Sequence, residues 1–234
     1  MSKVCLVKFC GMRDNPTIAF AVDLGVNYIG FIVDFPKDPR SITRDELLHK
    51  AKWMRNNHKG NYKIVAVTVD MPLENLEYII DSGLIDVIQL SGDEHISICR
   101  LVKEGIETWR TVNAKNPPSE EEIKTLAKSV DKIVLDSGSA LEKARNTAGV
   151  FENTELYNAF VNQRTGVILS GMINATNIAD YLRRYDPAII DVSHGVEGSP
   201  GVKAKQKMME FADAVNKFYK EEDGEVVDEV DEEE

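Results

Sequence analysis

Cysteine is scarce in this sequence, and its pattern argues against two classes of protein. The 234 residues contain three cysteines, Cys5, Cys10 and Cys99, which is an odd number with no C-x-x-C pair. A disulfide framework or a structural zinc site needs paired or clustered cysteines. We therefore expect free thiols, a cytoplasmic protein and no bound metal.

Long apolar runs and a net positive charge are also missing. No run of 18 apolar residues occurs, so we expect no membrane-spanning helix. The last fourteen residues hold ten of the 39 acidic residues and none of the 28 basic ones, so residues 1–220 carry a net charge near −1. Such a body offers no basic surface for displacing counterions, and we expect no nucleic-acid binding. The acidic segment 221–234 has little to bury and is predicted to be disordered.

The sequence does contain a regular alternation of short apolar runs and amphipathic segments. Runs with little polar interruption are typical of parallel strands that are buried on both faces. We predict eight strands, each followed by a helix. The predicted strands are 4–9, 28–33, 64–69, 86–90, 106–112, 132–136, 166–170 and 188–192. The predicted helices are 15–25, 43–58, 73–81, 94–103, 119–129, 153–162, 174–184 and 202–219.

Eight such units within residues 1–220 fit a single closed (β/α)8 TIM barrel, followed by the acidic tail 221–234. The competing fold is an open, doubly wound sheet. That fold usually carries a G-x-G-x-x-G turn after its first strand, whereas residues 10–15 read CGMRDN. We therefore predict the barrel.

Polar residues at the ends of the predicted strands are the candidates for a site, because barrel sites are built from the loops that follow the strands. Lys8 and Cys10 are two residues apart and share a face, so the lysine charge favours a reactive thiolate. Asp136 and Asp191 each close a later strand. A structural interpretation stays open, in which Cys10 is a small buried side chain and Lys8 pairs with an interior acid such as Asp191.

Glycine-bearing turns follow the last two predicted strands. The turns contain Gly171 and Met172 in one case and Ser193, His194 and Gly195 in the other. Exposed N–H groups and helix N-termini bind phosphate at this place in many barrels. We expect a phosphate site there, and no metal site, because His194 has no second ligand at a recognisable spacing.

Six segments of the chain resemble, in the same order, motifs of the phosphoribosylanthranilate isomerase family, the (β/α)8 barrels of the tryptophan pathway. The resemblance covers residues 3 to about 216, and its first and last motifs are the most specific. The segments are 8–11 (family motif K-[IF]-C-G), 30–40 (G-F-x-F-x-x-x-S-P-R), 89–94 (Q-L-H-G-D-E), 135–137 (L-D-[ST]), 169–174 (L-A-G-G-L-N) and 191–201 (D-V-S-S-G-V-E-x-x-P-G).

The resemblance implies an Amadori rearrangement without a cofactor, in which N-(5-phosphoribosyl)anthranilate becomes 1-(2-carboxyphenylamino)-1-deoxyribulose 5-phosphate. It implies that Cys10 is the general base, that Asp136 is the general acid and that Arg40 holds the anthranilate carboxylate. A base near neutral pH requires a lowered thiol pKa, which Lys8 could supply. The other expected substrate-binding residues are Lys8, Gln89 and Asp191, and the expected phosphate-binding residues are Gly171, Met172, Ser193, His194 and Gly195. The expected partner is this phosphosugar alone, bound by a monomer or homodimer.

The sequence departs from the family motifs at three places. Met172 stands in place of a glycine, Ser91 in place of a histidine, and residues 146–151 in place of a glycine-rich run. Two other functions therefore stay open: another phosphosugar isomerase on the same scaffold, such as the histidine-pathway enzyme, and a noncatalytic phosphosugar-binding barrel. The histidine-pathway enzyme works with two aspartates, whereas the first strand here ends in Cys10.

Overall fold

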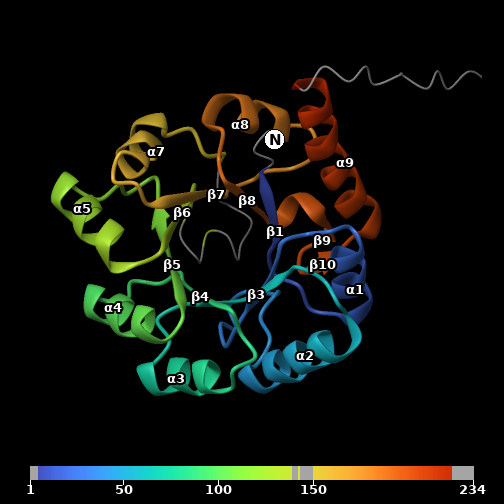
Figure 1. Ribbon diagram of the computed structural model, residues 1–234, viewed down its shortest axis with the longest axis horizontal. Coiled ribbons are helices and arrows are strands. Elements are labelled where there is room, and N and C mark those ends of the chain that lie inside the picture. Colours follow the sequence, from blue (N-terminus) through green and yellow to red (C-terminus); the bar gives the residue numbers. More distant parts are fainter. Residues whose placement is uncertain (1–4, 139–141, 143–149, 223–234) are drawn as a thin grey trace, which may run out of the picture.

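Eight parallel strands form a closed barrel in the computed structural model, which describes residues 5–138, 142 and 150–222. The strands pair in chain order, and β8 closes the barrel by pairing with β1 (Figure 1). They are β1 Leu6–Phe9, β2 Tyr28–Ile32, β3 Lys63–Thr68, β4 Val87–Leu90, β5 Glu107–Asn113, β6 Lys132–Asp136, β7 Gly166–Leu169 and β8 Ile189–Val192. The predicted (β/α)8 barrel is confirmed, and the open sheet is excluded.

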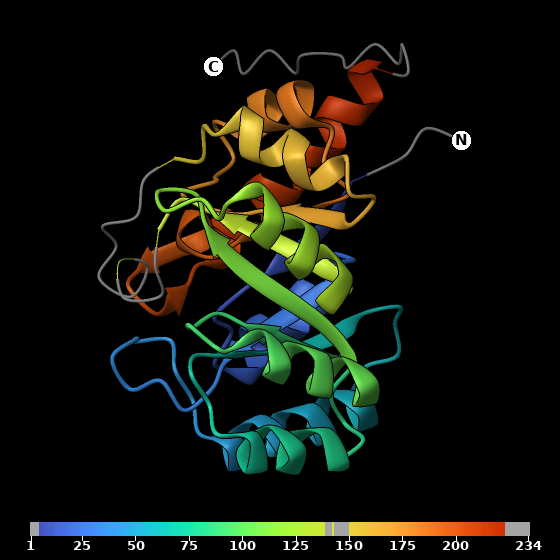
Figure 2. The ribbon, with the colours of Figure 1, turned by 90° about the vertical axis from the view of Figure 1, so that its left-hand side faces the viewer.

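Helices surround the barrel and cover its outer face, as the side view in Figure 2 also shows. They are α1 Asn15–Asp23, α2 Arg44–Asn57, α3 Leu73–Asp81, α4 Ile96–Gly105, α5 Glu120–Ser129, α7 Thr154–Val161, α8 Ile178–Tyr185 and α9 Lys205–Glu222. Thr43 and Ser119 begin α2 and α5 with capping boxes. None of the helices in the described ranges is long and apolar enough to cross a membrane.

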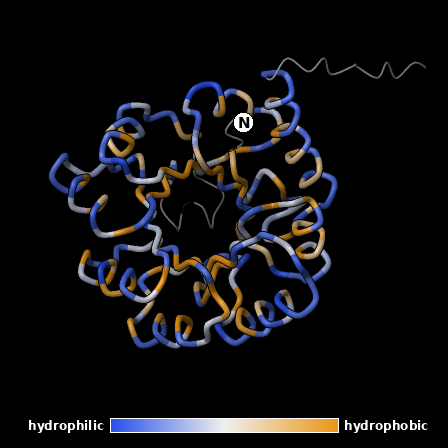
Figure 3. The backbone as a smooth tube through the Cα atoms, viewed as in Figure 1, coloured by the Kyte–Doolittle hydropathy of each residue, from blue (hydrophilic) through white to orange (hydrophobic). Residues whose placement is uncertain are grey.

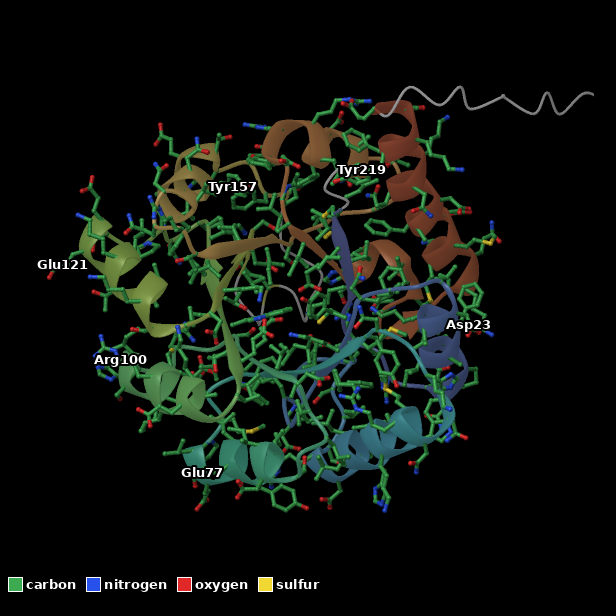
Figure 4. The ribbon with its side chains drawn as sticks, in the orientation of Figure 1. Asp23, Glu77, Arg100, Glu121, Tyr157 and Tyr219 are labelled. Carbon is green, nitrogen blue, oxygen red and sulfur yellow. The ribbon has the colours of Figure 1, made fainter. Side chains whose placement is uncertain are left out.

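The core has two layers, separated by the strand backbones. One apolar layer lies between the strands and the helices, and a smaller one fills the barrel interior around Val65, Val87 and Trp109. Figure 3 shows the corresponding pattern of hydrophobic strands and mostly hydrophilic outer helix surfaces. Glu77, Arg100 and Glu121 point outward from their helices in Figure 4. Because successive strand residues face opposite layers, the polar residues at i, i+2 positions of the strand ends point into the barrel.

The segment after β8 differs from the prediction. Instead of a helix that begins at residue 202, the chain forms a hairpin of β9 (Glu197–Ser199) and β10 (Val202–Lys203), and α9 begins at Lys205. The turn at Pro200-Gly201 needs a glycine, because Gly201 has φ +80°. The predicted start of the last helix was therefore wrong.

The end of the last helix also differs from the prediction. Helix α9 continues to Glu222, so the first two residues of the expected tail, 221 and 222, are helical. Residues 223–234 lie outside the described ranges, and their disorder stays a prediction. The altered loop expected at 146–151 lies mostly outside the described residues as well.

A charge cluster closes the amino-terminal end of the barrel around Glu107 on β5. This carboxylate accepts hydrogen bonds from Lys132, from Lys63 at 2.5 Å and from the Trp109 indole at 2.8 Å. Burial alone would raise the pKa of Glu107, but these hydrogen bonds outweigh it and lower the pKa to about 2.

We expect Glu107→Gln to lower the free energy of unfolding at pH 7 by about 1–2 kcal/mol, after allowance for solvent screening. A depressed carboxylate pKa stabilises the fold above the unfolded pKa, and that contribution is lost as the pH falls through the folded value. The difference between variant and wild type should therefore shrink between about pH 4.5 and pH 2 in urea unfolding curves. Glu121→Gln, at an exposed position of α5, is the matched control. A difference that stayed constant down to pH 2 would contradict the assigned role of Glu107.

Candidate active site

A pocket opens at the carboxyl ends of the strands and collects most of the predicted site residues. These residues come from β4, β6 and β8 and from the segments that follow β1, β2, β7 and β8. The predicted residues that line the pocket are Cys10, Arg40, Gln89, Asp136, Gly171, Met172, Asp191, Ser193 and His194. Of the described candidates, Lys8 and Gly195 do not line this pocket; Gly195 lines a neighbouring one that shares Met172 and His194 with it. Most of the residues that the sequence marks as candidates therefore lie together in one pocket.

Lys8 lies beneath the pocket floor and forms a buried ion pair across the β1–β8 seam. Its Nζ donates to Asp191 Oδ1 at 2.9 Å, and both side chains are almost completely buried. Lys8 and Asp191 are register partners of the two strands, which explains the contact. Burial opposes the lysine charge, but Asp191 and Cys10 raise the pKa of Lys8 above its ordinary value. The structural interpretation of Lys8 is thus confirmed: it neutralises Asp191.

Cys10 stands directly above this pair and faces the pocket. Burial raises the pKa of the Cys10 thiol, and Asp191 raises it further. The positive charges of Lys8 and Lys203 lower the pKa, but they do not outweigh burial. The charge of Lys8 therefore lowers the pKa of the Cys10 thiol, as expected. The pKa of the thiol is nevertheless raised overall, so the expected lowered value was wrong.

Asp136 ends β6, which lies three strands away from β1 around the closed barrel. Its side chain is 1% exposed, lines the same pocket as Cys10 and accepts a hydrogen bond from Gly138 N at 3.2 Å. A thiol and a carboxyl group thus reach one pocket from strands β1 and β6. This pair offers one base and one acid on two sides of a small ligand.

The turns after β7 and β8 lie against each other. A Cβ atom on Gly195 would lie 2.0 Å from the carbonyl oxygen of Ile173 and 2.8 Å from the Cα of Asn174. Gly171 is similarly tight, because an added Cβ would lie 2.3 Å from Ser137 Oγ and the backbone has φ +103°. The close approach brings the backbone of both turns to one edge of the pocket, where an anion can meet several N–H groups.

Met172 adopts a backbone conformation that favours glycine, with φ +51°. Its side chain lines the pocket beside Gly171 and His194. The chain therefore accommodates a non-glycine residue at the predicted phosphate turn with local backbone strain, and it keeps the turn itself.

We expect Gly195→Ala to weaken binding at this edge of the pocket, because the added methyl group must push the two turns apart. A displacement of about 1 Å between binding groups costs on the order of 100-fold in catalytic efficiency. The measurement is kcat/KM for the phosphorylated substrate, together with inhibition by inorganic phosphate. Gly198→Ala in β9 is the matched control, because its added Cβ meets only Ala204 Cβ at 3.5 Å. Equal kinetics for the two variants would contradict the role assigned to the paired turns.

Arg40 reaches the pocket from the loop between β2 and α2 and is 1% exposed. Its Nε and Nη2 donate to the two carboxylate oxygens of Glu197 at 2.7 and 2.8 Å, and its Nη1 donates to Asp38 Oδ1 at 3.1 Å. The aliphatic part of the Arg40 side chain packs against Gly11. A Cβ atom at position 11 would lie only 2.6 Å from Arg40 Cδ, so a larger residue there would displace Arg40. The guanidinium plane is therefore fixed before any ligand arrives.

Sequence reasoning missed Glu197 and Lys203. Both side chains are buried, and Lys203 Nζ donates to Glu197 Oε1 at 2.9 Å. Burial opposes the Glu197 charge, but hydrogen bonds from Arg40 and the charge of Lys203 lower the pKa of this carboxyl group. Glu197 does stand inside the last family motif, yet nothing in the sequence showed that β9 and β10 would pair and bury it with Lys203.

Gln89 lies on the pocket floor with two hydroxyl groups beside it. Its Nε2 donates to Thr111 Oγ1 at 3.1 Å and to Ser91 Oγ at 3.3 Å, and the two hydroxyl oxygens are 2.7 Å apart. Its Oε1 is buried and has no hydrogen-bond partner among the described residues. A buried acceptor without a partner costs free energy, and a hydrogen-bond donor on a bound ligand would remove that cost.

The barrel and its pocket place the chain among the (β/α)8-barrel enzymes, whose sites lie at the carboxyl ends of the strands. A family model described as N-(5'phosphoribosyl)anthranilate (PRA) isomerase matches residues 7–214. The chain belongs to this family.

Individual relatives agree with the family match. The N-(5'-phosphoribosyl)anthranilate isomerase of Rhizobium meliloti is 34% identical over 217 residues, which cover 90% of this chain and 97% of the relative. The enzyme of the same name from Sinorhizobium fredii is 33% identical, with 90% and 93% covered. The crystal structure of phosphoribosyl anthranilate isomerase from Thermus thermophilus has the same fold, with a TM-score of 0.76, 21% identity and coverage of 91% of this chain and 98% of that chain.

Proposed function

We propose that Cys10 and Asp136 carry out the reaction of this family in the present chain, as base and acid respectively. The enzyme is an aldose–ketose isomerase of tryptophan biosynthesis. It converts N-(5'-phosphoribosyl)anthranilate into 1-(2-carboxyphenylamino)-1-deoxyribulose 5-phosphate. The observation that carries the assignment of roles is that the Cys10 thiol and the Asp136 carboxyl group line one pocket from strands β1 and β6.

Asp136 acts first in this mechanism. It donates a proton to the furanose ring oxygen, the bond from that oxygen to C1 breaks, and the nitrogen lone pair forms a C1–N iminium. Ring opening therefore places a positive charge in the pocket. Burial of Asp136 below the strand ends keeps the carboxyl group close to the ring oxygen of a substrate that lies across the barrel mouth.

Cys10 acts second. Its thiolate takes the proton from C2, and the electron pair of that C–H bond moves toward the iminium nitrogen to give an enolamine. C1 then gains a proton while the C2 hydroxyl loses one, which leaves the ketone at C2. The proton taken up by Cys10 offsets the proton given by Asp136, so that atoms and electrons balance without a cofactor. The raised pKa of Cys10 favours the thiol in the free pocket. The positive iminium, together with Lys8, favours the thiolate at the moment when a base is needed.

The two ends of the substrate are held at opposite parts of the pocket. We assign the anthranilate carboxylate to the guanidinium of Arg40 and the phosphate to the turns that contain Gly171, Met172, Ser193, His194 and Gly195. Gln89 and Asp191 face the sugar between them, and the unpartnered Oε1 of Gln89 accepts a hydrogen bond from a substrate donor. The protein works as a monomer or homodimer. We also propose a cytoplasmic location, which its three free thiols support.

The test is a direct turnover assay with freshly formed N-(5'-phosphoribosyl)anthranilate, followed by the loss of its anthranilate fluorescence. The aldose substrate of the histidine-pathway isomerase is offered in parallel. We expect turnover of the anthranilate substrate in large excess over the other. Preference for the histidine-pathway substrate would favour the alternative isomerase, and saturable binding without turnover would favour a noncatalytic barrel.

A further inference from the structure

Lys203 is a completely enclosed lysine whose three ammonium hydrogens are all directed at protein oxygens. Its Nζ lies 3.0 Å from Ser193 O, 3.2 Å from Ser193 Oγ and 2.9 Å from Glu197 Oε1. Burial lowers the pKa of Lys203, and the charge of Glu197 opposes that effect. Burying a lysine costs desolvation energy, so packing alone does not explain this side chain. Its hydrogen-bond partners indicate its role instead.

The contacts of Lys203 join two parts of the pocket that are far apart in the chain. On one side, Lys203 holds both the carbonyl and the hydroxyl of Ser193, which begins the turn after β8. On the other side it shares Glu197 with Arg40, and Glu197 receives two hydrogen bonds from that guanidinium. Ser193 and Arg40 both line the pocket, whereas Lys203 and Glu197 lie behind it. The hairpin of β9 and β10 supplies both connecting residues.

We propose that Lys203 is a positioning residue that fixes the Ser193 turn against the Arg40–Glu197 pair, so that the phosphate end and the carboxylate end of the substrate are held at a set separation. The inference rests on the proposed function for the identity of the substrate. The role of Lys203 at the turn after β8 can be tested without that substrate, because inorganic phosphate binds at the same turn. Glu197 serves as the shared acceptor between the two cations.

Lys203 also contributes to the electrostatic field at the base. The charged groups that act on Cys10 are Lys8 and Asp191 beneath it and Lys203 from the β9–β10 hairpin. The charge of Lys203 lowers the pKa of the Cys10 thiol, so its removal moves the ionisation of the base to higher pH. This gives the proposal a readout that a purely structural lysine would not change.

The test is Lys203→Met, which retains the length of the side chain and removes its charge and donors. We expect inorganic phosphate, as a competitive inhibitor, to bind about 10- to 100-fold more weakly, because Ser193 loses its tether. Anthranilate as an inhibitor should change less than about threefold, since Glu197 and Arg40 remain paired. The rise of kcat/KM with pH should move to higher pH.

Lys205→Met is the matched control, since Lys205 is exposed at the start of α9 and lies over the Phe20 ring. It should leave all of these values unchanged. If Lys203→Met does not fold, Lys203→Gln, which keeps two N–H donors, should show the same pattern with smaller changes. Unchanged phosphate inhibition and an unchanged pH profile in a folded variant would overturn the inference. A wild-type enzyme without turnover would instead remove the proposed function, and direct binding of inorganic phosphate to wild type and Lys203→Met would then decide on Lys203.

Discussion

Asp136→Asn and Cys10→Ser are each expected to lower kcat by about 100- to 10,000-fold while the protein stays folded, since general acid–base groups contribute on this scale. Asparagine cannot donate a proton to the ring oxygen, and a serine hydroxyl is a far weaker base than a thiolate. Both replacements are close in size, so the buried strand ends of β1 and β6 keep their packing. The measurement is the initial rate of anthranilate fluorescence loss at saturating substrate.

Two control variants separate this effect from general damage. Cys99→Ser alters a cysteine buried in α4, and Asp131→Asn alters a carboxylate that accepts from Thr108 N at the opposite end of the barrel. Both controls are expected to keep near-normal kcat. Near-wild-type turnover in either Asp136→Asn or Cys10→Ser would remove that residue from the mechanism, whatever the controls show.

The second large effect concerns stability. Lys8→Met leaves Asp191 as an unpaired charge inside the barrel, and we expect the free energy of unfolding to fall by about 3–5 kcal/mol. Asp191→Leu leaves Lys8 unpaired and should cost a similar amount. The double variant Lys8→Met/Asp191→Leu removes both charges, so it should lose much less than the two single variants together. Urea unfolding followed by circular dichroism gives all three values.

The exposed ion pair Lys217–Glu221 on α9, with its atoms 3.8 Å apart, is the control for this cycle. Its removal should change the free energy of unfolding by no more than about 0.5 kcal/mol. If the Lys8 and Asp191 variants were as mild as this control, or if their effects were additive, the buried pair would not have the energetic role assigned to it.

Local sequence signals predicted the barrel because they coincide with local physics. The apolar run 132–136 became β6 and the amphipathic run 73–81 became α3 with the predicted limits. The capping boxes at Thr43 and Ser119 marked two helix starts, because the hydrogen bonds that define them are made within four residues. The turn at Asn174 shows the limit of this reasoning. Asn174 Oδ1 accepts from Thr176 N and Asn177 N, which delays α8 to Ile178, although helical periodicity begins earlier.

The site was predicted in part for a related reason. Parallel strands bring their carboxyl ends to one mouth, so Cys10, Asp136 and the turns after β7 and β8 had to meet once the barrel was accepted. The family motifs then supplied expected roles. No local sequence signal indicated which charged residues inside the barrel form ion pairs. Lys8 had two possible interpretations until the register of β1 against β8 placed it opposite Asp191.

The sequence by itself determined the alternation of strands and helices, the closed barrel and the rim on which the site lies, because these depend on hydrophobic periodicity and on residues close together in the chain. Only the tertiary structure decided that Glu197 and Lys203 contact the pocket residues Arg40 and Ser193, since Glu197 meets Arg40 across 157 positions of sequence. It also decided that burial outweighs the neighbouring lysines at Cys10. Solvent exclusion and long-range ion pairs depend on which surfaces come together, and no local pattern of residues specifies that.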